Sequence, residues 1–209
     1  MQEYYIPTQD SETEFVEKRS RFIGHVAHVE TEEDARAFIT AMKKKYHDAR
    51  HNCWCYVIRN EGVVRYSDDG EPQGTAGQPM LNVFTRENIT DVVCVVTRYF
   101  GGILLGAGGL VRAYTRSAKD ALDEAGVSVV RRWVELSIPC GYNLFAKLQL
   151  ETESWQGIVT DTEYGADVTL KALLPEERAE DFIAHVIDIT AGSVRPSLCG
   201  EALKAVPIR

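Results

Sequence analysis

The chain has 209 residues, of which 44% are hydrophobic and 26% are charged, a composition that can bury ordinary cores and excludes general disorder. Its net charge of −8 argues against a uniformly basic nucleic-acid-binding domain. The first five residues lack a signal-peptide pattern, the longest nearly apolar stretch (residues 101–111) is about half of a membrane-spanning helix, and the five cysteines are odd in number and scattered. We therefore expect a cytoplasmic protein with no membrane partner.

The first half of the chain predicts alternating strands and helices. Thr31 precedes three acidic residues in the form of a capping box, and apolar residues follow at helical spacing. Apolar side chains alternate over residues 51–59, and the β-branched run over 91–99 is typical of a strand buried on both faces. In order, the expected elements are a strand near residues 22–29, a helix over 31–46, strands over 51–59 and 63–66, a loop over 68–79, a strand over 91–99 and a helix over 104–125.

The composition changes at Gly126, and the second half predicts the order β-α-β-β-α-β of a ferredoxin-like domain. The expected elements are strands over 134–139, 156–163, 166–172 and 193–204 and helices over 143–153 and 175–187. The fold class is therefore α+β, with one domain over residues 1–130 and a ferredoxin-like domain over residues 131–209.

The glycine-rich segment over residues 98–114 is the first candidate site. A buried strand enters a glycine-rich turn and then a helix, whose first N–H groups can hold an anion. The spacing fits neither a dinucleotide-binding loop nor a P-loop, so close packing of the helix on the sheet remains an equal explanation of the glycines. The residues assigned to ligand or anion binding are Thr75, Arg98, Gly101, Gly102, Gly106, Gly108, Gly109 and Arg112.

The loop over residues 68–79 is the second candidate. Asp68, Asp69 and Glu71 bring three carboxylates together, which could move protons or hold Mg²⁺, or could simply cap backbone groups of an acidic turn. On the strand that precedes it, His51, Cys53 and Cys55 share a face but lack zinc-like spacing, so we predict no metal and no cofactor.

Charge is distributed unevenly along the chain. Residues 36–65 contain seven basic side chains and two acids, and residues 98–119 contain four basic side chains and no acid. An acidic protein with such local stretches can still bind a polyanion at close range. Arg98, Arg112 and Arg116 are the predicted nucleic-acid contacts.

Three segments together resemble the IMPACT/YigZ family, in its bacterial two-domain form: residues 49–53 (ARHNC), residues 66–77 (YSDDGEPQGTAG) and residues 98–106 (RYFGGILLG). The resemblance implies an N-terminal β-α domain of the ribosomal-protein and elongation-factor type and a C-terminal domain like the last domain of elongation factor G. It also implies a role near translation, since the eukaryotic relatives restrain a starvation-activated initiation-factor kinase through a protein partner. That role depends partly on an extra N-terminal domain that we do not expect here, so the eukaryotic mechanism is not carried over.

The sequence therefore favours a non-enzymatic regulatory protein, associated with translation, that contacts RNA or the ribosome and could also have a protein partner. One alternative is an enzyme that acts on a small phosphorylated or anionic substrate with Asp68, Asp69 and Glu71. The other is a protein-interaction module that uses exposed Trp54, Tyr56 or Trp155.

Overall fold

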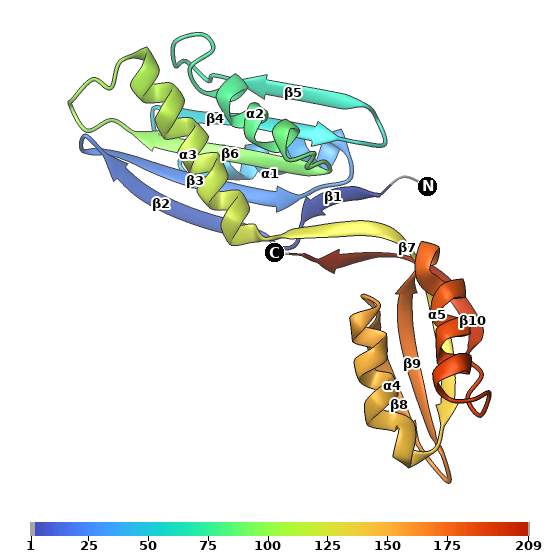
Figure 1. The fold of residues 1–209 in the computed structure, drawn as a ribbon. Helices are drawn as coiled ribbons and strands as arrows, with labels where there is room; N and C mark the ends of the chain where they lie inside the picture. Colours follow the sequence, from blue (N-terminus) through green and yellow to red (C-terminus); the bar gives the residue numbers. More distant parts are fainter. Residues whose placement is uncertain (1–2, 209) are drawn as a thin grey trace. The chain divides into compact units, whose positions relative to one another are not determined.

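The computed structural model describes residues 3–208, which form two compact units. One unit contains residues 4–129 with residues 205–208, and the other contains residue 3 with residues 130–204. Each has its own sheet and its own core, so the protein is a mixed α/β protein of two domains with antiparallel sheets (Figure 1).

The first unit is built on a five-stranded sheet in the order β2-β3-β6-β4-β5, in which every neighbouring pair is antiparallel. The sheet contains β2 (Ser11–Glu17), β3 (Ser20–His28), β4 (His51–Ile58), β5 (Val63–Ser67) and β6 (Val92–Tyr99). The other elements of this unit are β1 (Tyr4–Pro7) and the helices α1 (Glu32–Lys45), α2 (Gly77–Arg86) and α3 (Ala107–Ala125).

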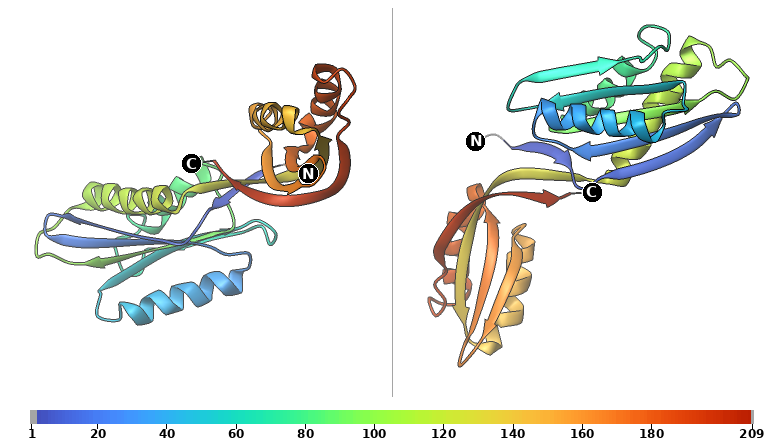
Figure 2. Two further views of the ribbon diagram at one scale, coloured as in Figure 1. Left: turned by 90° about the horizontal axis from the view of Figure 1, so that it is seen from below. Right: turned by 180° about the vertical axis from the view of Figure 1, so that it is seen from behind.

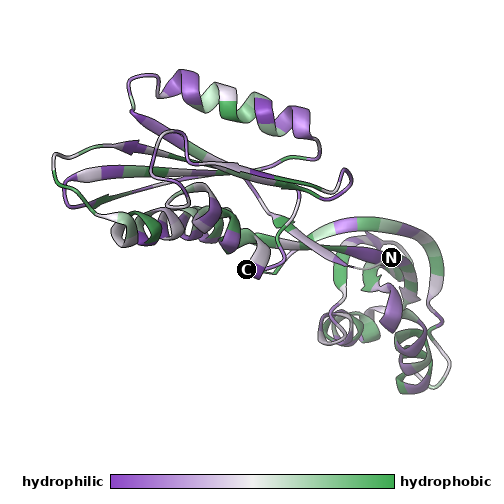
Figure 3. Cartoon of the chain, turned by 90° about the horizontal axis from the view of Figure 1, so that it is seen from above, coloured by the Kyte–Doolittle hydropathy of each residue, from purple (hydrophilic) through white to green (hydrophobic). Residues whose placement is uncertain are grey.

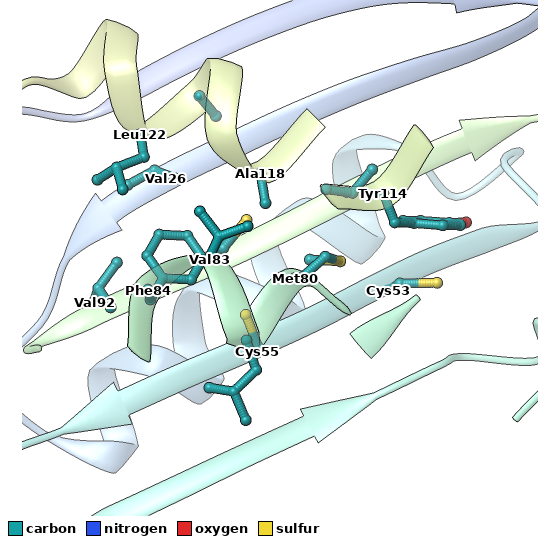
Figure 4. Packing of buried hydrophobic residues seen from close by; sticks show 14 of the residues in the cluster. Val26, Cys53, Cys55, Met80, Val83, Phe84, Val92, Tyr114, Ala118 and Leu122 are labelled. Carbon is teal, nitrogen blue, oxygen red and sulfur yellow. The ribbon is translucent and has the colours of Figure 1, made fainter. Parts of the chain in front are cut away.

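Helices cover both faces of this sheet (Figure 2). Alternate residues of the central strand β6 point to opposite faces, so Cys94 and Val96 pack under α2 and α3 while Val93 and Val95 pack under α1. The α2–α3 side holds the larger core, in which Tyr114 and Cys53 lie at the same end of the labelled cluster (Figure 4). Because β6 is buried on both faces, its sequence is almost continuously apolar.

Helix α1 follows its predicted start closely. The Thr31 hydroxyl accepts a hydrogen bond from the Asp34 N–H at 3.1 Å, which satisfies one of the first free amides. Its two ends are hydrophilic and its middle contains the hydrophobic residues that face the sheet (Figure 3).

The structure corrects several sequence-based boundaries. The predicted loop over residues 68–79 ends in helix α2, which the sequence did not predict because Gly77 and Pro79 are typical of loops. The edge strand β2 was also missed, since polar residues dominate it. Helix α3 begins at Ala107, three residues after the expected start.

The second unit has the element order β-α-β-β-α-β and the strand order β10-β7-β9-β8. Its elements are β7 (Val127–Cys140), α4 (Tyr142–Ser154), β8 (Ile158–Tyr164), β9 (Val168–Pro175), α5 (Glu176–Ile189) and β10 (Ser197–Pro207). Both helices pack on one sheet face around Leu136, Leu170 and Phe182, and half-buried Trp155 stands edge-on against Phe182.

Tyr56 is only 2% exposed, so the expectation that it forms part of an exposed aromatic surface is wrong, whereas Trp54 and Trp155 are half-buried. No helix within residues 3–208 is both long enough and apolar enough to span a bilayer.

Candidate functional site

The segment between β5 and α2 is held by the side chain of Asp68. Its two carboxylate oxygens accept hydrogen bonds from the backbone N–H groups of Gly74 (2.8 Å), Ala76 (3.0 Å) and Gly77 (2.8 Å). These amides lie at and before the start of α2, where N–H groups have no partner inside the helix and the helix dipole favours a negative charge. Asp68 therefore acts as a remote cap that folds the loop and begins the helix.

Asp69 connects the same loop to β4 and α1. Its carboxylate accepts the Asn52 backbone N–H at 2.8 Å and pairs with the Lys43 ammonium at 2.6 Å. Asp69 itself has a positive φ of 41°, a conformation that aspartate tolerates better than most residues. Both acids thus have structural contacts that define the loop.

Glu71 is different, because its side chain is buried. Its Oε1 atom accepts hydrogen bonds from the Arg98 guanidinium at 2.6 Å and from the Tyr114 hydroxyl at 2.9 Å. The Glu71 and Arg98 side chains are 3% and 6% exposed, so this ion pair is removed from water. Burial, together with nearby Cys53 and Glu71, raises the pKa of Tyr114, so its hydroxyl remains a proton donor.

His51 lies beside this ion pair at the start of β4. Its Nδ1 atom is 2.9 Å from the Asp69 carbonyl oxygen, an acceptor, so Nδ1 is the donor, and in the corresponding tautomer Nε2 is an acceptor. Nε2 is 3.9 Å from Glu71 Oε1, which is too long for a direct hydrogen bond.

A cavity of about 350 Å³ opens onto these groups. His51, Glu71, Arg98 and exposed Arg50 contribute its charged and polar wall. The remaining lining residues come from the two glycine-rich segments: Gly70, Pro72, Phe100, Leu104, Leu105, Gly106, Ala107 and Leu110. The two segments that the sequence singled out therefore meet at one cavity.

The start of α3 forms part of this wall and is not capped by a side chain. Gly106 is the cap residue, with φ of 73°, and the first turn contains no acid. The first hydrogen bond of the helix joins the Leu110 N–H to the Gly106 carbonyl, so the amides of residues 107–109 precede the helical ladder.

Other glycines in this region serve packing. A Cβ atom on Gly101 would lie 2.0 Å from the Arg19 carbonyl carbon, so only glycine fits there. The Gly101 N–H donates to the buried Ser20 hydroxyl at 3.2 Å, which ties the loop to β3. Gly102 has φ of 82° and open space around it, a turn conformation that favours glycine. Gly101 is therefore required by close packing of the loop on the Arg19–Ser20 backbone, which differs from the expected packing of the helix on the sheet.

Arg112 and Arg116 lie on the exposed side of α3, away from the buried ion pair. They line a second hollow of about 220 Å³ with Lys18, Glu17 and the aromatic ring of Phe15. The Arg116 guanidinium stands 4.4 Å over the Phe15 ring and also pairs with Asp120 at 3.2 Å. This surface, which we call the basic hollow, carries three cations and one acid in its lining.

The predicted site residues thus separate into groups. Gly106, Arg98 and Glu71 line the cavity. Gly108 and Gly109 lie in the first turn of α3, and Gly109 lines the basic hollow. Thr75 is buried and its hydroxyl donates to the Pro72 carbonyl at 2.6 Å, so it stabilises the loop. Arg98 is too buried to meet a phosphate on the surface, in contrast to Arg112 and Arg116.

Sequence reasoning gave no role to His51 or Tyr114. His51 comes from β4 and Tyr114 from α3, and both approach Glu71 only when these distant segments of the chain pack together. The sequence carries no local signal for such contacts. Cys53 and Cys55 lie in the core, and burial raises the pKa of each thiol. Within residues 3–208 no group of three His, Cys, Asp or Glu side chains is arranged to hold a metal ion.

The fold and the cavity define a class: a two-domain, mixed α/β protein whose N-terminal unit encloses a buried ionic cluster below two glycine-rich loops. The family model for the Impact N-terminal domain matches residues 18–122, and a model described as a domain of unknown function matches residues 138–193. The chain belongs to the IMPACT family.

Individual relatives agree with this assignment. The chain is 37% identical over 190 residues to the IMPACT family member YvyE of Bacillus subtilis, which covers 90% of this chain and 88% of the relative. It is 35% identical over 181 residues to the IMPACT family member YigZ of Escherichia coli, covering 85% and 89% of the two chains. A crystal structure of a hypothetical protein aligns with a TM-score of 0.59 and 32% identity, covering 96% of this chain and 98% of the other.

Proposed function

We propose that this protein is a non-enzymatic, translation-associated regulatory protein that contacts RNA or the ribosome through the basic hollow and the adjoining start of α3. The proposal rests on one observation: Arg112, Arg116 and Lys18 gather on an exposed surface beside a helix start without a cap or an acid. Arginine and lysine side chains and free helix amides are the groups that contact nucleic-acid phosphates. A role near translation is what the resemblance to this family implies.

The arrangement fits binding to the phosphate backbone better than reading of bases. The Arg116 guanidinium lies over Phe15, which fixes its position but occupies that ring face. No ion pair involves the Arg112 guanidinium among the described residues, so it is available to a phosphate. We therefore expect the affinity for RNA to depend weakly on the RNA sequence and strongly on the salt concentration.

The experiment is fluorescence anisotropy with a short single-stranded RNA at low and moderate salt. Arg112→Glu is expected to weaken binding at least tenfold at low salt, because it replaces a favourable phosphate contact by a repulsive one. Lys147→Glu makes the same charge change on exposed α4 of the second unit and is the matched control. Equal affinities for wild type and Arg112→Glu would exclude the basic hollow as the contact.

In the enzyme hypothesis, the set of candidate catalytic carboxylates becomes smaller. Asp68 and Asp69 bond to backbone amides and to a lysine, so of the three candidate carboxylates only Glu71 lines the cavity. Any chemistry on a small anionic substrate would depend on Glu71 and His51 together.

A further inference from the structure

The buried ion pair at the base of the cavity is costly to maintain. A carboxylate and a guanidinium lose their hydration on burial, and a well-packed apolar pair of the same size would often be as stable or more stable. Glu71 satisfies both Arg98 and Tyr114 through one oxygen, Oε1, while the Nε atom of Arg98 is buried without a hydrogen-bond partner in the described chain. Ionisable groups kept in this way beside a cavity are typical of binding and catalytic sites.

We propose that this cavity binds a small molecule that carries an anionic group and a hydroxyl group. This inference goes beyond the proposed contact with RNA, because it concerns the cavity lined by His51 and Glu71 and a ligand of different size, although both sites use the start of α3. At about 30 Å³ per water-sized group, a volume of 350 Å³ accommodates about a dozen such groups.

The hydroxyl end is defined by His51 and Glu71. The Nδ1 proton of His51 is used by the Asp69 carbonyl, which leaves Nε2 as an acceptor. Nε2 and Glu71 Oε1 are 3.9 Å apart and are both acceptors, so neither satisfies the other. A ligand hydroxyl in the cavity donates its one proton to Nε2, since Glu71 Oε1 already accepts from Arg98 and Tyr114.

The anionic end is defined by the start of α3. Gly106 and Ala107 line the cavity, and the amides of residues 107–109 precede the helical ladder with no acid in the first turn. The Arg98 charge is neutralised by Glu71, so the anion is held by the Ala107 amide at the helix start and by exposed Arg50, which also lines the cavity. Phosphate and carboxylate share this chemistry.

The remaining wall is apolar and partly open. Phe100 is 45% exposed and Leu104 is 82% exposed, although both lie beside a cavity large enough for a ligand. A ligand that packs its carbon skeleton against them removes apolar surface from water.

Isothermal titration calorimetry with four probes tests the inference. Glycerol 3-phosphate carries both groups with a phosphate and glycerate carries both with a carboxylate, while inorganic phosphate and glycerol carry one group each. We expect one of the two complete probes to bind at least tenfold more tightly than either half. The stronger complete probe identifies the anion class, and equal affinities for complete and half probes, or no binding of any probe, would overturn the proposal.

Two variants locate the binding. His51→Asn keeps an amide donor near the Nδ1 position but removes Nε2, so it is expected to weaken the complete probe about tenfold and to leave inorganic phosphate unchanged. Ala107→Asp places a carboxylate at an exposed helix start, where it favours folding, and is expected to abolish binding of both anions. Asn143→Asp in the first turn of α4 is the matched control. Unchanged binding in Ala107→Asp would overturn the site even if His51→Asn failed to fold.

Discussion

Removing the charge of Glu71 tests how far the buried ion pair stabilises the first unit. Glu71→Gln keeps the shape of the side chain but leaves the Arg98 guanidinium, 6% exposed, without its counter-charge. Loss of one partner of a buried pair costs about 3–5 kcal/mol, and we expect a value near 3 because the glutamine carbonyl still accepts a hydrogen bond. Since about 1.4 kcal/mol corresponds to a factor of ten, the fraction of molecules in which the first unit is unfolded should rise about 100-fold.

Hydrogen exchange followed by mass spectrometry measures this effect in each unit separately. Amides of β6 report on the unit that contains Glu71, and amides of β9 in the other unit are an internal control. We expect faster exchange in β6 with no change in β9.

A double-variant cycle refines the test. Arg98→Met leaves Glu71 without its cation and should destabilise alone, but the combination with Glu71→Gln leaves neither charge behind. The double variant should therefore be more stable than the sum of the single effects by about 1 kcal/mol or more. A cost of less than about 1 kcal/mol for Glu71→Gln, or simple additivity, would refute the reasoning.

Three further predictions concern the loops and the sheet. Asp68→Ala removes acceptors from three backbone amides and is expected to cost about 2 kcal/mol or more, with faster exchange at the start of α2, whereas exposed Asp10→Ala should have no effect. Gly101→Ala should destabilise the unit far more in urea unfolding than Gly102→Ala, because only Gly101→Ala places a Cβ atom against backbone atoms. Gly102→Ala should cost about 1 kcal/mol of backbone strain. Equal costs would contradict the close approach. Burial lowers the pKa of His25 from 6.5 to about 4, so the unfolded chain binds more protons than the folded chain between these two values. The free energy of unfolding should therefore fall as pH drops from about 6.5 to about 4. Replacing His25 with asparagine should flatten that part of the stability profile, and an unchanged slope would contradict the assignment.

The sequence predicted those parts of the fold whose signals are local. Alternation along β4, the β-branched run of β6 and the cap at Thr31 each reflect the environment of one element, and all three elements were predicted. Helix α2 was missed because its cap, Asp68, lies nine residues before Gly77 and leaves no pattern at the helix start. Without knowledge of the Asp68 contact, the sequence of its first turn is typical of a loop.

The candidate site shows the same limit. Both glycine-rich segments were identified from sequence, but the residues at the base of the cavity meet only through the sheet register. In that register His51 lies opposite Arg98 on the neighbouring strand, which brings it to Glu71. The carboxylates of Asp68, Asp69 and Glu71 are adjacent in sequence yet bond to different partners, which spacing alone could not reveal.

Ribosome co-sedimentation of the purified protein tests the central proposal most directly. The assay compares wild type with Arg112→Glu at low and at moderate salt, with and without nuclease treatment. We expect wild-type protein to co-sediment at low salt and to be released by moderate salt or nuclease, because phosphate contacts weaken steeply with salt. The Arg112→Glu variant should co-sediment far less than wild type at low salt. Absence of co-sedimentation at low salt, or binding that ignores salt, nuclease and the Arg112 charge, would contradict the proposed contact with RNA.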